Sequence, residues 1–150
     1  MNKGIYIKNR KAHFEYFLLD KFEAGIVLTG SEVKSIRLGG AELVNSYIYI
    51  NNQLEIFTEG VKIRKPKTSL DKEFNPERPK KLLLHKKQIL KLKEKLKEKG
   101  TTIVPVALYF NERGFAKLEI ALAKGKADYD KRKTIKERDL KRQERKENNS

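Results

Sequence analysis

Runs of β-branched and aromatic residues dominate the first 123 positions and predict a mainly β domain. Residues 16–19 and 26–28 form two such runs, separated by the charged stretch 20–23, and are expected to be two strands. Residues 46–50 and 53–57 flank Asn51-Asn52. Because asparagine tolerates the left-handed backbone of a tight turn, this pair of runs predicts a β-hairpin.

A second hairpin is predicted nearer the C-terminus. Residues 102–110 and 115–120 are rich in strand-forming side chains, and residues 111–114 between them are typical of a turn. Pro105 has no N–H to donate to a neighbouring strand, so it is expected at a sheet edge or a bulge.

Two helices are predicted between the strands. Ser31 is a suitable N-cap for a helix over 32–38, which Gly39-Gly40 would end. A second helix is expected over 86–99, because three apolar residues recur there at helical spacing and Gly100 follows: Ile89, Leu92 and Leu96. Several short strands with a few packed helices predict a small closed or partly open antiparallel barrel.

Two segments stand out from this pattern by their charge. Residues 60–81 hold three prolines, eight basic residues and three acidic ones, and are expected to form a long basic loop. Residues 124–150 hold eleven basic and six acidic residues and few large apolar ones. Such a segment cannot bury enough surface to offset its ordering entropy, so we expect a domain over 1–123 and a basic tail that is disordered when free.

Composition narrows the class of function. The 150 residues carry a formal net charge of +15 and no cysteine. A charge of that size favours a polyanionic partner, with nucleic acid as the first candidate and an anionic membrane surface as the second. The lack of cysteine removes thiolate chemistry and most structural zinc sites. Without an apolar run of about 20 residues or a signal peptide, a cytoplasmic protein that does not span a membrane is expected.

The search for catalytic residues yields little. His13 and His85 lie at no metal-ligand spacing, and His13 is interpreted as a surface residue on a strand edge. Glu15, Asp20 and Glu23 allow the hypothesis of a metal-dependent nuclease, although such clusters are usually solvated. There is no phosphate-binding glycine loop and no nucleophile elbow. The sequence therefore predicts no enzyme, cofactor or metal site.

Features of RNA binding are stronger than those of catalysis. Basic residues stand beside glycine, proline or apolar residues in three places: Lys34-Ser35-Ile36-Arg37, Arg78-Pro79-Lys80-Lys81 and Lys124-Gly125-Lys126. Phosphate contacts supply affinity in such surfaces, and stacked aromatic rings supply fit. Tyr47 and Tyr49 share one face of a predicted strand, and core packing and base stacking both remain open for them.

The order of several short motifs resembles the small protein B family, the SsrA-binding proteins of bacteria. The motifs are 9–12 (NRKA), 22–26 (FEAGI), 30–37 (GSEVKSIR), 45–47 (NSY), 78–84 (RPKKLLL), 100–105, 123–126 (AKGK), 130–132 (DKR) and 136–138 (KER). They cover essentially the whole chain.

This resemblance implies an oligonucleotide-binding-type β-barrel with flanking helices. It implies a non-catalytic adaptor that binds the tRNA-like domain of transfer-messenger RNA and delivers it to stalled ribosomes for trans-translation. The partners it implies are that RNA, the small ribosomal subunit and its RNA, and, indirectly through the RNA, alanyl-tRNA synthetase and elongation factor Tu. A monomer is expected.

The resemblance also assigns site residues. Glu23 matches an acidic RNA-binding position, Leu83 matches an apolar one on the face opposite Leu82 and Leu84, and His85 stands where asparagine is expected. Phe14 stands where many members have histidine. The full expected RNA-binding set is Glu23, Gly25, Lys34, Ser35, Arg37, Tyr47, Arg78, Lys80, Lys81, Leu83, His85, Lys124, Gly125 and Lys126.

The tail matches the ribosome-reading element of the family. It would become helical in the decoding centre and the empty mRNA channel, with contacts from Tyr129, Asp130, Lys131, Arg132, Lys136 and Arg138. Composition alone fits a general RNA chaperone or a structural ribosomal protein equally well, and the nuclease hypothesis ranks below both.

Overall fold

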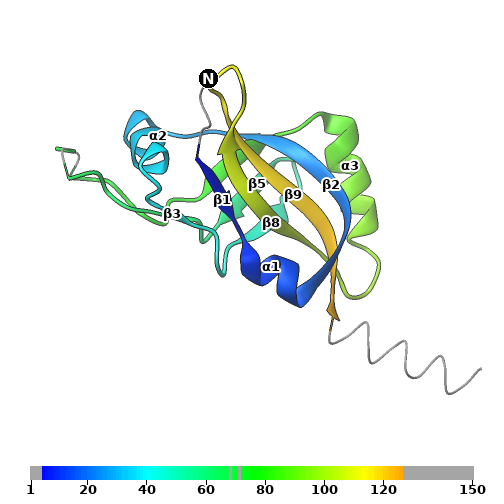
Figure 1. The fold of residues 1–150 in the computed structure, drawn as a ribbon. Coiled ribbons are helices and arrows are strands. Elements are labelled where there is room, and N and C mark those ends of the chain that lie inside the picture. The colour runs from blue at the N-terminus through cyan, green and yellow to red at the C-terminus, as the bar shows by residue number, and fades with distance from the viewer. Residues whose placement is uncertain (1–4, 68, 71, 127–150) are drawn as a thin grey trace, which may run out of the picture.

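The computed structural model describes residues 5–67, 69–70 and 72–126. In this part of the chain the elements are β1 (Tyr6–Lys8), α1 (Arg10–Glu15), β2 (Tyr16–Ile26), α2 (Gly30–Arg37), β3 (Ala41–Glu42), β4 (Tyr47–Ile50), β5 (Ile56–Glu59), β6 (Lys62–Ile63), β7 (Lys80–Leu83), α3 (Lys86–Lys95), β8 (Thr101–Phe110) and β9 (Ala116–Gly125) (Figure 1). The expectations for the tail residues 127–150 lie outside the described residues.

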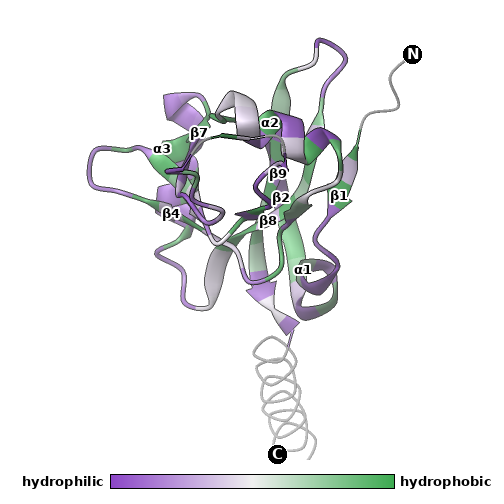
Figure 2. Ribbon diagram, turned by 90° about the vertical axis from the view of Figure 1, so that its left-hand side faces the viewer, coloured by the Kyte–Doolittle hydropathy of each residue, from purple (hydrophilic) through white to green (hydrophobic). Residues whose placement is uncertain are grey.

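The main sheet has seven strands in the order β1-β8-β9-β2-β7-β5-β4, and every neighbouring pair is antiparallel. The sheet curls until β4, at one end, packs against β8 near the other. Seen from the side, the strands run round a ring (Figure 2). Strands β3 and β6 form a separate two-stranded ribbon. The predicted small antiparallel barrel with flanking helices is confirmed.

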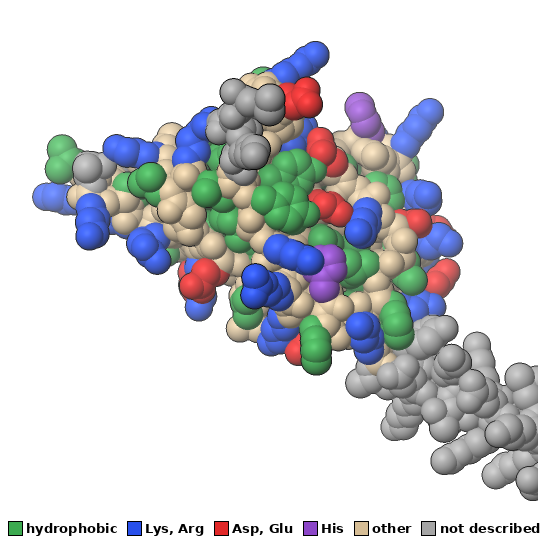
Figure 3. Space-filling model, in the orientation of Figure 1, with side chains coloured by type: hydrophobic (Ala, Val, Ile, Leu, Met, Phe, Trp, Pro, Cys, Tyr) green, Lys and Arg blue, Asp and Glu red, His purple; other side chains and the backbone are tan. Residues whose placement is uncertain are grey.

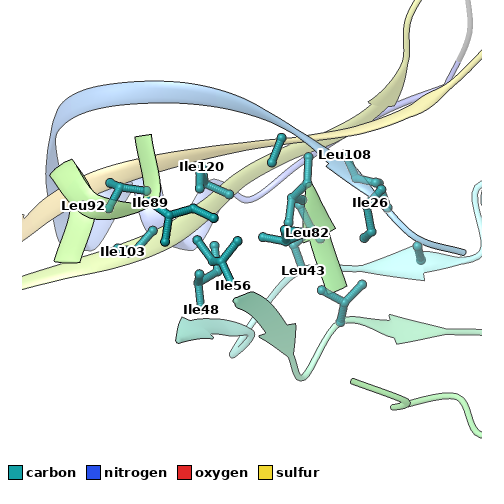
Figure 4. Packing of buried hydrophobic residues seen from close by; sticks show 14 of the residues in the cluster. Ile26, Leu43, Ile48, Ile56, Leu82, Ile89, Leu92, Ile103, Leu108 and Ile120 are labelled. Atoms are coloured by element: carbon teal, nitrogen blue, oxygen red, sulfur yellow. The ribbon is translucent and has the colours of Figure 1, made fainter. Parts of the chain in front are cut away.

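The inside of the barrel is filled by branched aliphatic side chains. Ile56, Ile120 and Leu108 are fully buried, and the cluster they belong to takes side chains from every strand of the central sheet, with β1 contributing only the partly buried Ile7 (Figure 4). Helix α3 lies across one opening and inserts Ile89 and Leu92 into this core. Burial of each such side chain stabilises the fold by about 1.5–3 kcal/mol. Because side chains alternate between the two faces of a strand, the face that carries the aliphatic residues turns inward.

A second, smaller core lies on the outer face of the sheet beneath α1. It consists mostly of small side chains: Ala12, Val104, Val106, Ala107, Ala121 and Ala123. Because these side chains are short, α1 can approach β8 closely. The run 103–108 is buried at every position for this reason, since one face of β8 meets the barrel interior and the other meets α1.

The expected pair of strands over 16–19 and 26–28 is wrong, because β2 is one strand of eleven residues. It pairs with β9 along nearly its whole length, from Tyr16 opposite Gly125 to Gly25 opposite Lys117, with a bulge between Leu18 and Lys21. The charged residues did not interrupt the strand, because their side chains point outward while Phe22 and Ala24 pack against the core.

Both predicted hairpins are confirmed, with one difference in the first. Ile50 pairs with Ile56, so the loop spans 51–55 rather than two asparagines. The left-handed residue is Leu54, with φ 60°. The Asn51 side chain instead accepts hydrogen bonds from two backbone N–H groups of the loop, and Asn111 does the same in the second hairpin. As expected, Pro105 lies at a bulge, between Pro105 and Ala107.

The helix boundaries differ from the expected ones. Helix α2 is capped by Thr29 rather than Ser31: the Glu32 N–H donates to Thr29 Oγ1 at 3.2 Å, and Glu32 Oε1 accepts from the Thr29 N–H at 2.8 Å. This capping box satisfies two N–H groups at the helix start. Helix α3 ends at Lys95, four residues earlier than expected.

Helix α1 was not expected from the sequence, because six residues show no clear helical period. Asn9 caps it through a hydrogen bond from the Ala12 N–H at 3.2 Å. His13 therefore lies on a helix rather than on a strand edge, which corrects the earlier interpretation.

The segment expected as a long basic loop is partly regular. Strand β6 lies inside it, and its last two residues, Lys80 and Lys81, begin β7. Strand β9 likewise continues two residues beyond Ala123, where the domain was expected to end. No helix among the described residues is long and apolar enough to cross a membrane.

Candidate nucleic-acid interface

A continuous row of residues crosses five strands on the outer face of the barrel. Gly25 on β2 lies opposite Leu83 on β7 and Lys117 on β9. Lys117 lies opposite Tyr109 on β8, which in turn lies opposite Tyr6 on β1. Directly opposed residues in a sheet point to the same side, so these side chains form one surface. Figure 3 shows hydrophobic side chains on this face, with charged ones beside them.

Leu83 covers the glycine in this row. Its side chain is 56% exposed, whereas that of the preceding Leu82 is 2% exposed and belongs to the core. A Cβ added at Gly25 would lie 3.2 Å from Leu83 Cβ, so glycine lets the two strands keep this approach. The expected alternation of Leu83 outward and Leu82 inward is confirmed.

Glu23 stands two residues before Gly25 on the same face. Its exposed carboxylate accepts a hydrogen bond from the Tyr109 hydroxyl. The Tyr109 ring stacks on Tyr6 with centroids 5.6 Å apart. Burial and the hydrogen bond to Glu23 raise the pKa of Tyr109 well above its usual range, because both favour the protonated hydroxyl that donates to the carboxylate. The carboxylate is thus held in one orientation with acceptor capacity to spare.

Lys81 and His85 extend the surface on either side of Leu83. Lys81 Nζ lies 3.0 Å from Glu55 Oε2, and its hydrogen bond lowers the pKa of the Glu55 carboxyl. His85 is exposed at the start of α3, where its backbone N–H donates to Gln88 Oε1 at 3.1 Å. Both residues are exposed, and we name the face that holds Glu23, Gly25, Lys81, Leu83 and His85 the Leu83 surface.

The aromatic residues of β4 and β5 also face outward. Tyr49 stacks on Phe57 with centroids 5.5 Å apart, and Phe57 lies opposite Lys81. Tyr47 is exposed, and its hydroxyl donates to Glu59. Neither Tyr47 nor Tyr49 belongs to the barrel core, so of the two readings left open for them core packing is wrong, and base stacking stays a prediction.

Two of the expected RNA-binding residues make ion pairs within the fold, and of these Arg78 stays partly exposed whereas Lys80 is buried. Arg78 Nη2 lies 2.6 Å from Glu32 Oε1, and Lys80 Nζ lies 3.7 Å from Glu32 Oε2. Lys80 is 0% exposed and also donates to the backbone carbonyl oxygens of Val61 and Arg78, so RNA cannot reach its ammonium group. Arg78 donates to the Val27 carbonyl oxygen as well, at 3.2 Å.

The electrostatics of this cluster follow from its burial. Burial by itself would raise the pKa of Glu32, but hydrogen bonds from Arg78 and the Thr29 N–H, with the charges of Lys80 and Arg78, hold it below its usual value. Burial lowers the pKa of Lys80, and Glu32 partly opposes that shift. The cluster ties the start of β7 to the start of α2, and so positions the strand that carries Leu83.

The remaining expected residues on α2 divide into one buried and two exposed. Ser35 is buried and donates to the Gly40 carbonyl oxygen at 3.4 Å. Lys34 and Arg37 are exposed, and the Arg37 guanidinium lies 4.5 Å from the centroid of the Phe110 ring. Ser35 therefore acts within the fold, because a buried hydroxyl bonded to backbone is not offered to a ligand.

Lys124, Gly125 and Lys126 lie at the far end of β9. Gly125 pairs with Tyr16, and Lys126 Nζ donates to the His13 carbonyl oxygen at 3.3 Å. Burial lowers the pKa of His13, and the positive charges of Lys8 and Lys21 lower it further. In the described ranges, no three His, Asp or Glu side chains come close enough to hold a metal ion. The nuclease hypothesis would require Glu15, Asp20 and Glu23 to form a metal cluster, and they form none.

Tyr6, Tyr109 and Lys117 were not expected in the site. Each is an ordinary strand residue in the sequence, and only the pairing of β1, β8 and β9 with β2 places them beside Glu23 and Gly25. The expected tail contacts at Tyr129, Asp130, Lys131, Arg132, Lys136 and Arg138 lie outside the described residues.

Comparison with known proteins gives a consistent result. The family model described as "SmpB protein" matches residues 6–150. A relative named "SsrA-binding protein" from Chlorobaculum tepidum is 50% identical over 137 residues, covering 91% of this chain and 87% of the relative. Another of the same name, from Sulfurihydrogenibium sp., is 50% identical over 143 residues, covering 95% of this chain and 93% of the relative.

A solved structure agrees with these matches. A chain from the structure described as "tmRNA-SmpB: a journey to the center of the bacterial ribosome" superposes with a TM-score of 0.68 at 40% identity, covering 81% of this chain and 84% of that one. A family model that spans nearly the whole sequence, together with relatives of this identity, is decisive, and the chain belongs to the SmpB protein family.

Proposed function

We propose that this protein binds SsrA RNA, the transfer-messenger RNA, at its tRNA-like domain and delivers it to stalled ribosomes as a non-catalytic adaptor. The observation that carries the proposal is the convergence of Glu23, Gly25 and Leu83 on one exposed face, flanked by lysines. The family membership and the names of the relatives support the same RNA.

The chemistry of this face suits folded RNA. The Glu23 carboxylate accepts hydrogen bonds, which a ribose 2′-hydroxyl or a base amino group can donate. Leu83 offers an apolar contact to a sugar or an unstacked base, and Lys81 and Lys117 offer cations to phosphates. The Glu23 carboxylate, with Glu119 opposite it on β9, repels the RNA backbone locally, so the surface favours an RNA whose shape places a donor at that point.

The tail belongs to the second half of the proposal. Residues Tyr129, Asp130, Lys131, Arg132, Lys136 and Arg138 would occupy the decoding centre and the empty mRNA channel, helical when docked, where basic side chains replace the missing message among ribosomal RNA phosphates. Alanyl-tRNA synthetase and elongation factor Tu would join through the RNA. This activity would place the protein in the cytoplasm with the ribosome.

A competition experiment tests the proposal. Labelled tRNA-like domain of transfer-messenger RNA is bound at physiological salt and challenged with excess ordinary elongator tRNA. We expect the labelled RNA to remain bound, because the outer face recognises features particular to its fold. If ordinary tRNA displaces it at equal concentration, net charge provides the binding, and a general RNA chaperone becomes the better description.

A further inference from the structure

A second basic concavity lies away from the outer sheet face, between the C-terminal end of α2 and the segment after β6. Its cavity is about 250 Å³, and its lining among the described residues includes four basic side chains, Lys34, Arg64, Lys65 and Lys67, and no acidic one. We name it the α2 groove. Leu38, which is 78% exposed, and Pro66 contribute the apolar part of the lining.

The walls of the α2 groove are held together by backbone contacts. The Arg64 N–H donates to the Gly40 carbonyl oxygen at 2.7 Å, and the Gly40 N–H donates to the Ser35 carbonyl oxygen at 2.8 Å. A Cβ at Gly40 would lie 2.5 Å from Ser35 Oγ and 3.4 Å from Arg64 Cβ, so only glycine permits this approach. The groove is therefore formed before any ligand arrives.

The lining selects one class of ligand. The described residues that line the groove bring several cations together, and such a group attracts an anion with several charges. The neighbouring larger cavity differs because Glu42 and Glu77 line it. Leu38 and Pro66 can pack against a sugar or a base edge, but the described lining residues include no aromatic ring for stacking. A volume of this size accommodates about one nucleotide rather than a larger ligand.

The groove also lies far from the end of β9. The segment around Pro66 projects from one end of the molecule, whereas β9 ends at Gly125 on the opposite side (Figure 1). Lys and Arg side chains surround the projecting end (Figure 3). The groove also shares no described lining residue with the row of Gly25, Leu83 and Lys117, so an RNA that contacts it would be held at a second point.

We propose that the α2 groove binds phosphates of an RNA backbone, as a sequence-independent contact that supplements the Leu83 surface. This inference rests on the proposed function in one respect, namely that the ligand is an RNA. Contacts of this kind fix the register of a complex and make its affinity depend on salt, but they do not select a sequence.

The test compares two triple variants of the full chain with equal loss of charge. R64Q/K65Q/K67Q removes three cations from the groove, and K93Q/K95Q/K97Q removes three exposed cations from the last turn of α3 and the residues just after it. The dissociation constant is measured across a salt series for two separate ligands, the SsrA RNA and ribosomes without message. The two ligands distinguish which RNA supplies the phosphates.

For at least one ligand, we expect the groove variant to bind about tenfold more weakly at low salt. The slope of the logarithm of the binding constant against the logarithm of the salt concentration should become shallower by roughly 1–3, since each phosphate contact contributes about 0.9. The α3 variant should change that slope far less. Equal effects of the two variants on both ligands would overturn the proposal. The preference for SsrA RNA over tRNA is measured separately in the unsubstituted protein. A failure of the proposed function can therefore be told apart from a failure of the groove proposal.

Discussion

Tyr109 and Glu23 form a hydrogen bond although their strands are not neighbours. Strand β9 lies between β8 and β2, and the Tyr109 side chain reaches across it to the carboxylate. The ring is held from the other side by stacking on Tyr6. Three strands thus cooperate to orient one acidic side chain at the centre of the proposed RNA surface.

Tyr109→Phe should weaken SsrA RNA binding about 2- to 12-fold, the range expected when one hydrogen bond of 0.5–1.5 kcal/mol is lost. The variant keeps the stacked ring and removes only the hydroxyl that orients Glu23, so thermal unfolding should change little. The measurement is a double-mutant cycle with Glu23→Ala, in which Tyr109→Phe should have no further effect. An equal loss in both backgrounds would show instead that the Tyr109 hydroxyl contacts the RNA directly.

Leu82 and Leu83 offer a matched pair of neighbours with opposite roles. Leu82→Ala should lower the free energy of unfolding by about 2–5 kcal/mol, because it opens a cavity in the barrel core. Leu83→Ala should leave urea unfolding nearly unchanged and reduce SsrA RNA affinity, because the lost side chain is exposed on the binding face. Normal RNA affinity for Leu83→Ala would move the binding surface elsewhere.

Glu32→Gln should destabilise the fold by about 3–5 kcal/mol, because it leaves the Lys80 ammonium buried without its counter-ion. Glutamine preserves the N3 position of the capping box, so the loss reports on charge. Glu94→Gln, which breaks the exposed contact with Lys97, is the control and should change stability by less than about 1 kcal/mol. Urea unfolding at neutral pH measures both.

The same carboxyl predicts a pH dependence. The pKa of Glu32 is lower in the folded state than its ordinary value of 4.5, so below that pH the unfolded chain binds a proton that the folded chain does not. The stability contributed by Glu32 is therefore complete above pH 4.5 and is lost as the pH falls through the folded-state pKa. Unfolding curves between pH 3 and 7 should show this loss in the natural chain and a smaller one in Glu32→Gln.

Truncation at two nearby points separates fold from tail. A chain that ends at Lys126 keeps every contact described above, and should retain the unfolding free energy and the SsrA RNA affinity while losing tagging of incomplete proteins on stalled ribosomes. A chain that ends at Ala123 loses the pairing of Lys124 with Phe17 and Thr101, and should be less stable. Loss of RNA affinity on truncation after Lys126 would contradict the proposed division of labour.

Local patterns were sufficient wherever a residue's role depends on its near neighbours. Both hairpins, the apolar face of α3 at Ile89 and Leu92, and the outward Leu83 follow from alternation, period and turn chemistry. The pattern misplaced the N-cap of α2 because Thr29 and Ser31 are chemically similar, and only the capping-box geometry with Glu32 selects Thr29. It also divided β2 at its charged residues, because a charge on an exposed face and a charge in a loop look alike in sequence.

The sequence by itself determined the β-rich class, the excess of positive charge and the family to which the motifs point. Only the tertiary structure decided which lysines are available to RNA. Lys80 belongs to a basic run and is nevertheless buried, because Glu32, 48 positions earlier, supplies its counter-ion. Tyr109 likewise meets Glu23 across 86 positions. The sequence near a polar residue shows only that burying or orienting that residue would cost free energy. The partner that offsets this cost lies on a distant strand or helix, which only folding brings near.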